Sequence, residues 1–283
     1  MRCEPTSVLL QRSDESHLAE ARATTKRVAR TFALACKLLP RGLRDDVYLL
    51  YLVFRTLDDL VDDGDPRASE RIAAVEAWCE NGPAGSREAQ LLAYLAQRHP
   101  LPRAALADFC AGMRDDLCGA PVQTEADLDV YCYRVAGTVG VVMSSLLGAT
   151  DPAAPHHAAA LGQAMQRTNI LRDIDEDLAA GRVYLARETL QRFCGGEVPP
   201  AARREALLRD QIARADELYD VGMEGIALLP CGRRAIAAAG AMYREILRQI
   251  EREGYGAQPG RAIVPRSRKL LVAARARVPA QQA

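Results

Sequence analysis

The spacing of apolar and polar residues predicts helices along almost the whole chain. Between His17 and Leu39, apolar and small residues recur every three or four positions, and Pro40 then ends the pattern. An apolar run at 47–54 belongs to a helix that opens after Gly42 and ends at Gly64. Similar patterns predict helices at about 67–80, 86–98, 102–118, 124–147, 201–228, 233–253 and from 265 onward, and one more that ends before Gly181.

The remaining segments carry no helical period. Residues 1–16 are polar and are predicted to be a flexible N-terminal segment, and the segment after Gly181 is predicted to be irregular. Thr124, three residues before Asp127, resembles a capping box at the start of its helix. The chain has no strand-like alternation, internal repeat or linker. The pattern therefore predicts one all-α domain over 17–283.

The end of the apolar helix at 47–63 carries an unusual density of acids. Its last nine residues read RTLDDLVDD, and on a helix Asp58 and Asp62 share one face. Four carboxylates at a helix C-terminus repel one another and oppose the macrodipole, at about 0.3–1 kcal/mol each. A bound cation would relieve this repulsion. Oxygen ligands without a nearby His or Cys favour a hard ion such as Mg2+, with Mn2+ as an alternative.

A second helix end repeats this arrangement. Residues 169–177 read NILRDIDED and precede Gly181, and Asp173 and Asp177 again share a face. An arginine precedes each group of acids, Arg55 in the first and Arg172 in the second. Together the two stretches predict one anionic mouth that binds Mg2+ and, through it, a diphosphate. Each acidic stretch alone has a plainer interpretation as a solvated helix end whose arginine neutralises its neighbours.

Composition and charge narrow the class of protein. The chain has 283 residues, of which 49 % are hydrophobic, and its 37 basic and 37 acidic residues balance. A nucleic-acid binder usually carries a basic surplus, so this class is not expected. Eight cysteines without a C-x-x-C pair predict reduced thiols, buried at Cys36, Cys110, Cys118 and Cys132, and a cytoplasmic protein. The longest uncharged run, 135–150, is too short for a transmembrane span.

Three motifs and their order resemble the squalene/phytoene synthase family, the head-to-head prenyl transferases. They are DDLVD at 58–62, YCYRVAGTVG at 131–140 and NILRDIDED at 169–177, and GRVYL at 181–185 is similar to the segment that follows in the family. The resemblance covers about residues 25–270. It implies an all-α isoprenoid-synthase fold around a central cavity, and a Mg2+-dependent prenyltransferase that joins two prenyl diphosphates, farnesyl or geranylgeranyl.

The resemblance also implies roles for individual residues. The implied metal ligands are Asp58, Asp62, Asn169, Asp173 and Asp177, and the implied catalytic residues add Arg55 and Tyr131. The implied substrate-binding residues are Phe32, Tyr51, Val135, Ala136, Gly137, Val139, Gly140, Gln166, Asn169, Arg172, Tyr243 and Arg261. The expected product is a squalene- or phytoene-type hydrocarbon, or the cyclopropyl diphosphate that precedes it.

The expected chemistry assigns a task to each kind of residue. Loss of diphosphate leaves an allylic cation, which needs a dry apolar cavity and aromatic faces worth about 0.5–2 kcal/mol each. Gly137 and Gly140 would let a prenyl chain pass close to a helix, although close contact between two helices is an equal explanation. Near Phe32 and at Ala186 the chain departs from the usual family pattern, which leaves product identity open.

Two other functions remain open at this point. A terpene synthase would use the same pocket on one prenyl diphosphate, and a non-catalytic lipid-binding or assembly protein could use the same fold. The sequence does not decide between C15 and C20 substrates, and the resemblance leaves the use of NADPH open. A lipid substrate could also bring a cytoplasmic protein to the membrane surface.

Overall fold

The computed structural model describes residues 6–257 and 260–278, and within these ranges it contains helices and no strand. This confirms the predicted all-α fold. The first helices are α1 (Thr6–Val28), α2 (Arg30–Cys36), α3 (Arg41–Asp62), α4 (Ala68–Cys79), α5 (Arg87–Ala96) and α6 (Arg103–Cys118). The middle of the chain forms α7 (Glu125–Cys132), the π-helical turn η1 (Tyr133–Gly137), α8 (Thr138–Leu146), α9 (Ala154–Ala179) and α10 (Arg187–Cys194). The last elements are η2 (Ala201–Arg203), α11 (Glu205–Glu224), η3 (Gly225–Leu228), α12 (Arg233–Arg252) and α13 (Arg266–Arg275).

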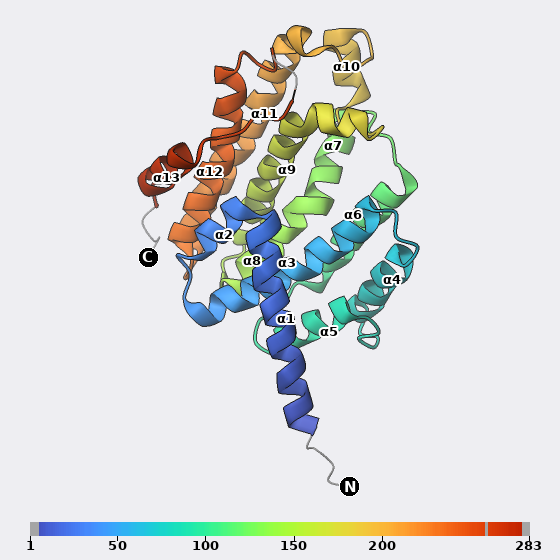
Figure 1. Cartoon of the computed structure of the whole chain (residues 1–283), viewed down its shortest axis with the longest axis vertical. Helices are drawn as coiled ribbons and strands as arrows, with labels where there is room; N and C mark the ends of the chain where they lie inside the picture. Colours follow the sequence, from blue (N-terminus) through green and yellow to red (C-terminus); the bar gives the residue numbers. More distant parts are fainter. Residues whose placement is uncertain (1–5, 258–259, 279–283) are drawn as a thin grey trace.

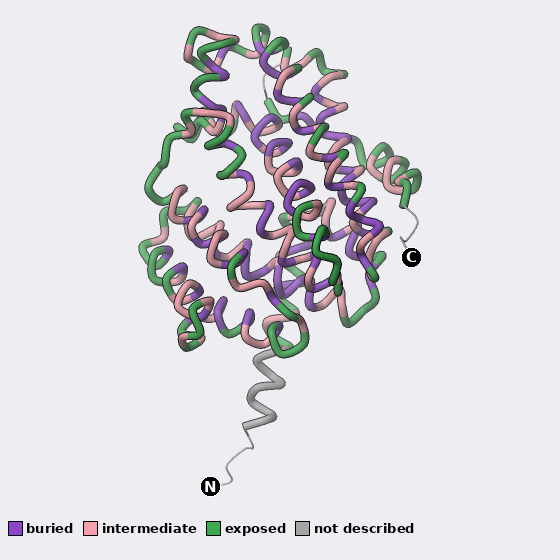
Figure 2. Tube along the Cα trace, turned by 180° about the vertical axis from the view of Figure 1, so that it is seen from behind, coloured by how far each residue is buried: buried purple, intermediate pink, exposed green. Residues whose placement is uncertain are grey.

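Helix α9 runs through the middle of the molecule (Figure 1). It packs against α11, α12, η1 and α8, while α4, α5 and α6 form the opposite side around α3. One core cluster joins α3 to α4, α5 and α6, and a second joins α9 to α11 and α12. Buried segments concentrate on these central helices (Figure 2). The two acidic helix ends therefore belong to different packed layers that face each other.

The local signals at two helix termini are confirmed. Helix α3 ends at Asp62, and Gly64 follows with a φ of 63°, in the left-handed region that favours glycine. The Thr124 hydroxyl accepts a hydrogen bond from the Asp127 amide (3.1 Å), and the Asp127 carboxylate accepts one from the Thr124 amide (2.9 Å). These bonds form the predicted capping box of α7.

The predicted helix at 17–39 is wrong in its extent. Helix α1 already begins at Thr6, so 6–16 are helical, while 1–5 lie outside the described residues. The chain then breaks at Ala29, whose φ and ψ are −117° and 55°. No Gly or Pro marks this break; α1 packs on α3 and α2 packs on α12, so the two halves must take different directions.

Two further expectations need correction. The helix predicted at 124–147 contains the π-helical turn η1, where the Thr138 hydroxyl donates a hydrogen bond to the Arg134 carbonyl (2.6 Å). The segment after Gly181 is not irregular throughout, because α10 forms there and buries Leu190 in the second core cluster. The polar composition of this segment obscured its helical periodicity, which becomes evident only in the packing of α10 against α11.

All cysteines in the described part of the chain are free thiols, as predicted. Cys36, Cys110 and Cys132 are buried, but Cys118 is exposed at the end of α6, contrary to expectation. Within 6–257 and 260–278, no helix combines the length and the apolar character needed to cross a bilayer.

Candidate active site

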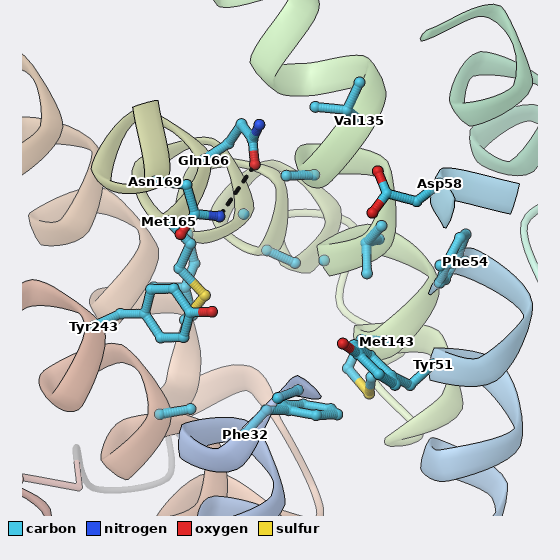
Figure 3. Close-up of a pocket in the computed structure, with 18 of the residues that line it drawn as sticks. Phe32, Tyr51, Phe54, Asp58, Val135, Met143, Met165, Gln166, Asn169 and Tyr243 are labelled. Carbon is cyan, nitrogen blue, oxygen red and sulfur yellow. Dashed lines mark hydrogen bonds between the residues drawn. The ribbon is translucent and has the colours of Figure 1, made fainter. Parts of the chain in front are cut away.

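A cavity of about 550 Å³ lies between α2, α3, α8, α9 and α12 (Figure 3). The predicted site residues that line it are Phe32, Tyr51, Arg55, Asp58, Asp62, Tyr131, Val135, Ala136, Val139, Gly140, Gln166, Asn169, Arg172, Asp173, Asp177, Tyr243 and Arg261. The structure thus brings together residues that are up to 229 positions apart in the sequence. Gly137 alone among the predicted residues does not line the cavity.

The two acidic helix ends lie on opposite walls of the cavity mouth. Asp58 and Asp62 come from the last turns of α3, and Asp173 and Asp177 come from the last turns of α9. Their four-residue spacing places each pair on one helix face, as predicted. Arg182, in the turn after α9, joins the two walls: its side chain pairs with Asp62 (2.6 Å), and its amide donates to the Asp177 carbonyl (2.8 Å).

The arginines that precede the acids contact them directly. Arg55 pairs with Asp58 (2.7 Å between Nη1 and Oδ2) and also contacts Asp59. Arg172 pairs with Asp173 (2.6 Å), and Arg261 reaches the same carboxylate (3.0 Å) from the loop before α13. These arginines therefore neutralise carboxylates and also line the cavity, and their part in binding a diphosphate stays a prediction.

Burial raises the pKa of two carboxyl groups at the cavity mouth. Although 41 % of the Asp58 side-chain surface is solvent-accessible, its surroundings at the cavity mouth desolvate the carboxyl group and raise its pKa to about 6 against the opposing effect of Arg55. Burial and the neighbouring Asp173 likewise raise the pKa of Asp177 to about 6. A cluster of carboxylates that resists ionisation has a high affinity for added positive charge.

Three residues that sequence reasoning did not place in the site, Asp116, Arg182 and Tyr184, line the cavity beside the acids. Asp116, on α6, lines the cavity and accepts a hydrogen bond from the Tyr131 hydroxyl (3.3 Å). Burial raises the pKa of Asp116 to about 7, and Asp58 and Asp62 add to the effect. The ring of Tyr184 stacks on Tyr131, with centroids 5.2 Å apart.

The sequence carried only weak signals for this group. Asp116 ends an ordinary helix with no motif around it, so only the fold reveals its place. Tyr184 and Arg182 belong to the GRVYL segment, whose similarity to the family gave neither residue a role.

The deep part of the cavity is apolar and aromatic. Phe32 and Tyr51 face each other with ring centroids 5.4 Å apart, and Met143 lies beside Tyr51 (Figure 3). Tyr243 and Met165 stand on the opposite wall in the same view. This arrangement gives an apolar chamber behind a charged mouth, which suits an amphiphile with an anionic head.

The glycines of the second motif serve helix packing. A Cβ on Gly140 would lie 2.2 Å from the Ala158 carbonyl oxygen of α9, and one on Gly137 would lie 3.3 Å from the Ala159 oxygen. Gly162, on α9, is in the same situation, since its Cβ would lie 2.2 Å from the Ala136 oxygen. Gly137 is buried in this contact, so its predicted role in substrate binding is wrong.

The polar atoms of the cavity mouth suit a ligand that carries both positive and negative charge. Asn169 donates to the Gln166 side chain (3.3 Å), but its buried Oδ1 has no hydrogen-bond partner among the described residues, nor has the buried Nε of Arg55. In the same part of the chain, no three His, Cys, Asp or Glu side chains converge on one metal position. The donors on the two facing walls are oxygens, which is the donor chemistry that fits Mg2+.

An all-α fold, an acidic mouth on two helix ends and an apolar chamber define a helical isoprenoid synthase. The family model described as squalene/phytoene synthase matches residues 25–268. The chain belongs to the squalene/phytoene synthase family and is a prenyltransferase of isoprenoid biosynthesis. A non-catalytic lipid-binding or assembly role is therefore not the one expected of this chain.

Individual relatives agree with this assignment. The chain is 35 % identical to a phytoene synthase from Arthrospira platensis, over 92 % of this chain and 91 % of the relative. It is 38 % identical to a phytoene synthase from Thermus thermophilus, over 80 % of each. Among solved structures, it resembles a dehydrosqualene synthase bound to a ligand (TM-score 0.83, 29 % identity, 93 % and 96 % coverage). It also resembles squalene synthase HpnC from Alicyclobacillus acidocaldarius (TM-score 0.73, 27 % identity, 86 % and 96 % coverage).

Proposed function

We propose that the protein joins two molecules of geranylgeranyl diphosphate head to head, in the presence of Mg2+, to give a C40 hydrocarbon of the phytoene type. The observation that carries the proposal is a cavity whose mouth is lined by two facing acid pairs and arginines, and whose interior is apolar. The choice of the C20 substrate rests on the relatives, since those at 35 % and 38 % identity are named phytoene synthases.

The mouth would bind the diphosphates. Mg2+ held by Asp58, Asp62, Asn169, Asp173 and Asp177 would neutralise the negative charge that develops on departing diphosphate. Arg172 and Arg261 pair with Asp173, and their donors would be free to bind phosphate oxygens if that carboxylate held Mg2+. The unpartnered Asn169 oxygen supports a ligand at the same place.

The chamber would protect the reacting carbons. When the carbon–oxygen bond of the first substrate breaks, its electron pair leaves with diphosphate and an allylic cation remains. The rings of Phe32, Tyr51, Tyr131 and Tyr243 line the cavity and can stabilise this cation by about 0.5–2 kcal/mol each. The apolar wall excludes the water that would capture the cation before the double bond of the second substrate attacks it.

The proposal is tested by product identity. The purified protein is incubated with Mg2+ and either geranylgeranyl or farnesyl diphosphate, with and without NADPH, and the extracted lipid is identified by mass. The proposal expects a C40 hydrocarbon from the C20 substrate whether or not NADPH is present. A C30 product from farnesyl diphosphate, with none from geranylgeranyl diphosphate, would overturn the assignment of the substrate.

The role of the acids is tested by substitution. Asp58→Ala or Asp173→Ala should abolish Mg2+-dependent turnover and leave the helical circular dichroism intact. Asp63→Ala is the matched control, because Asp63 belongs to the same acidic run but does not line the cavity. Undiminished turnover in Asp58→Ala would contradict the metal assignment.

A further inference from the structure

The segment 261–278 is basic and contains no acidic residue. Its six cations are Arg261, Arg266, Arg268, Lys269, Arg275 and Arg277. Two of them face inward, since Arg261 pairs with Asp173 in the cavity mouth and Arg268 donates to Glu245 of α12 (2.8 Å). Arg266, Arg275 and Arg277 are exposed. The outer side of this segment therefore carries uncompensated positive charge.

The same segment exposes large apolar side chains. The exposed fractions are 71 % for Ile263, 53 % for Leu270 and 40 % for Leu271. Helix α13 has no fully buried residue, although Ala273 packs on the core cluster that includes Met242 of α12. Leu271 lies four residues before Arg275, so leucine and arginine share the face turned away from Ala273. Figure 2 shows α13 as exposed and intermediate along its length.

This surface lies next to a place where the cavity wall reaches the outside. Lys269 of α13 donates a hydrogen bond to the Thr31 hydroxyl of α2 (3.1 Å), and the next residue, Phe32, lines the chamber. Val28, at the break between α1 and α2, also lines the chamber and is 39 % exposed. The chamber wall thus reaches the surface at Val28, three residues along the chain from the Thr31 contact with α13.

We propose that Ile263 and α13 form a docking surface for a bilayer that contains anionic phospholipid. Docking there would hold the exposed chamber wall at Val28 against that bilayer. Apolar side chains bordered by arginines, without acids, match the interface of such a bilayer, where the leucines enter the acyl boundary and the cations meet lipid phosphates. The proposal rests on the proposed function, because prenyl substrates and a hydrocarbon product reside in the bilayer.

The proposal is tested by sedimentation with vesicles of phosphatidylcholine alone or of phosphatidylcholine with phosphatidylglycerol. The wild type should bind the anionic vesicles more tightly. Arg275→Gln with Arg277→Gln should weaken this binding about thirty-fold at low salt. Leu270→Gln with Leu271→Gln should weaken binding to both kinds of vesicle at least about tenfold. Val130→Gln, which changes another exposed apolar residue (49 %), is the matched control and should bind as the wild type does.

Turnover of detergent-dispersed substrate, measured in parallel, separates this proposal from the proposed function. The α13 variants should keep that turnover and lose only vesicle binding, since none of the changed residues lines the cavity. Equal binding of the wild type to neutral and anionic vesicles, or wild-type binding by both double variants, would overturn the proposal. Concentration-dependent dimerisation that Leu270→Gln with Leu271→Gln removes, without vesicle binding, would overturn it in favour of a contact between two copies.

Discussion

The Gly140→Ala variant tests whether position 140 needs glycine for helix packing or for the passage of a prenyl chain. An added Cβ would lie 2.2 Å from the Ala158 oxygen and 2.9 Å from its carbonyl carbon, both backbone atoms of α9. Helices α8 and α9 would have to separate by about 1 Å to restore ordinary contact, and overpacking of this kind costs about 1–3 kcal/mol. The better helix propensity of alanine offsets about 1 kcal/mol.

The expected result is a net loss of stability of up to about 2 kcal/mol, equivalent to a Tm lowered by up to about 6 °C. Thermal and urea unfolding followed by circular dichroism measure it. Gly42→Ala is the matched control, because Gly42 lies in the first turn of α3 with nothing within 4 Å of an added Cβ, so stability should stay equal or rise slightly. If Gly140→Ala unfolds at the same temperature as Gly42→Ala, the packing explanation is refuted.

Two further predictions follow from contacts at the mouth. In the metal-free protein, burial raises the pKa of Asp116 to about 7 from 3.8, so the folded state binds this proton more tightly and the free energy of unfolding rises as pH falls from about 8 to 5. Asp116→Asn should remove this part of the pH dependence and be more stable than the wild type at pH 8; an unchanged pH profile would contradict the assignment. Asp175 accepts hydrogen bonds from Arg204 (2.6 Å) and from the Gly260 amide (2.7 Å), which fixes the loop that carries Arg261. Asp175→Ala should raise KM for the prenyl diphosphate about tenfold, whereas a wild-type KM would show that the loop needs no such support.

The acid pairs could be predicted because their information is local. A four-residue spacing on a helix fixes which carboxylates share a face, and Gly64 marks where the helix ends. The meeting of Asp58 with Asp173 across the cavity is a property of the fold. At the level of sequence, only the repeated arrangement of acids and arginine indicated that the two helix ends share one mouth.

The residues that escaped prediction depend on contacts distant in sequence. Asp116 gains its role only because α6 ends beside Tyr131, 15 residues away along the chain. The break at Ala29 has no sequence marker, since two partner helices determine it. For Gly140 the sequence allowed both explanations, because both need a missing side chain, and only the fold shows that the Ala158 oxygen lies 2.2 Å from the position of an added Cβ.

The central claim, that one cavity joins two prenyl diphosphates, is tested most directly by stoichiometry. Purified protein is given geranylgeranyl diphosphate and Mg2+, and released diphosphate is counted against hydrocarbon formed. Two diphosphates per C40 molecule are predicted, with no release in Asp173→Ala. One diphosphate per C20 product would contradict the claim and identify a terpene synthase working in the same chamber.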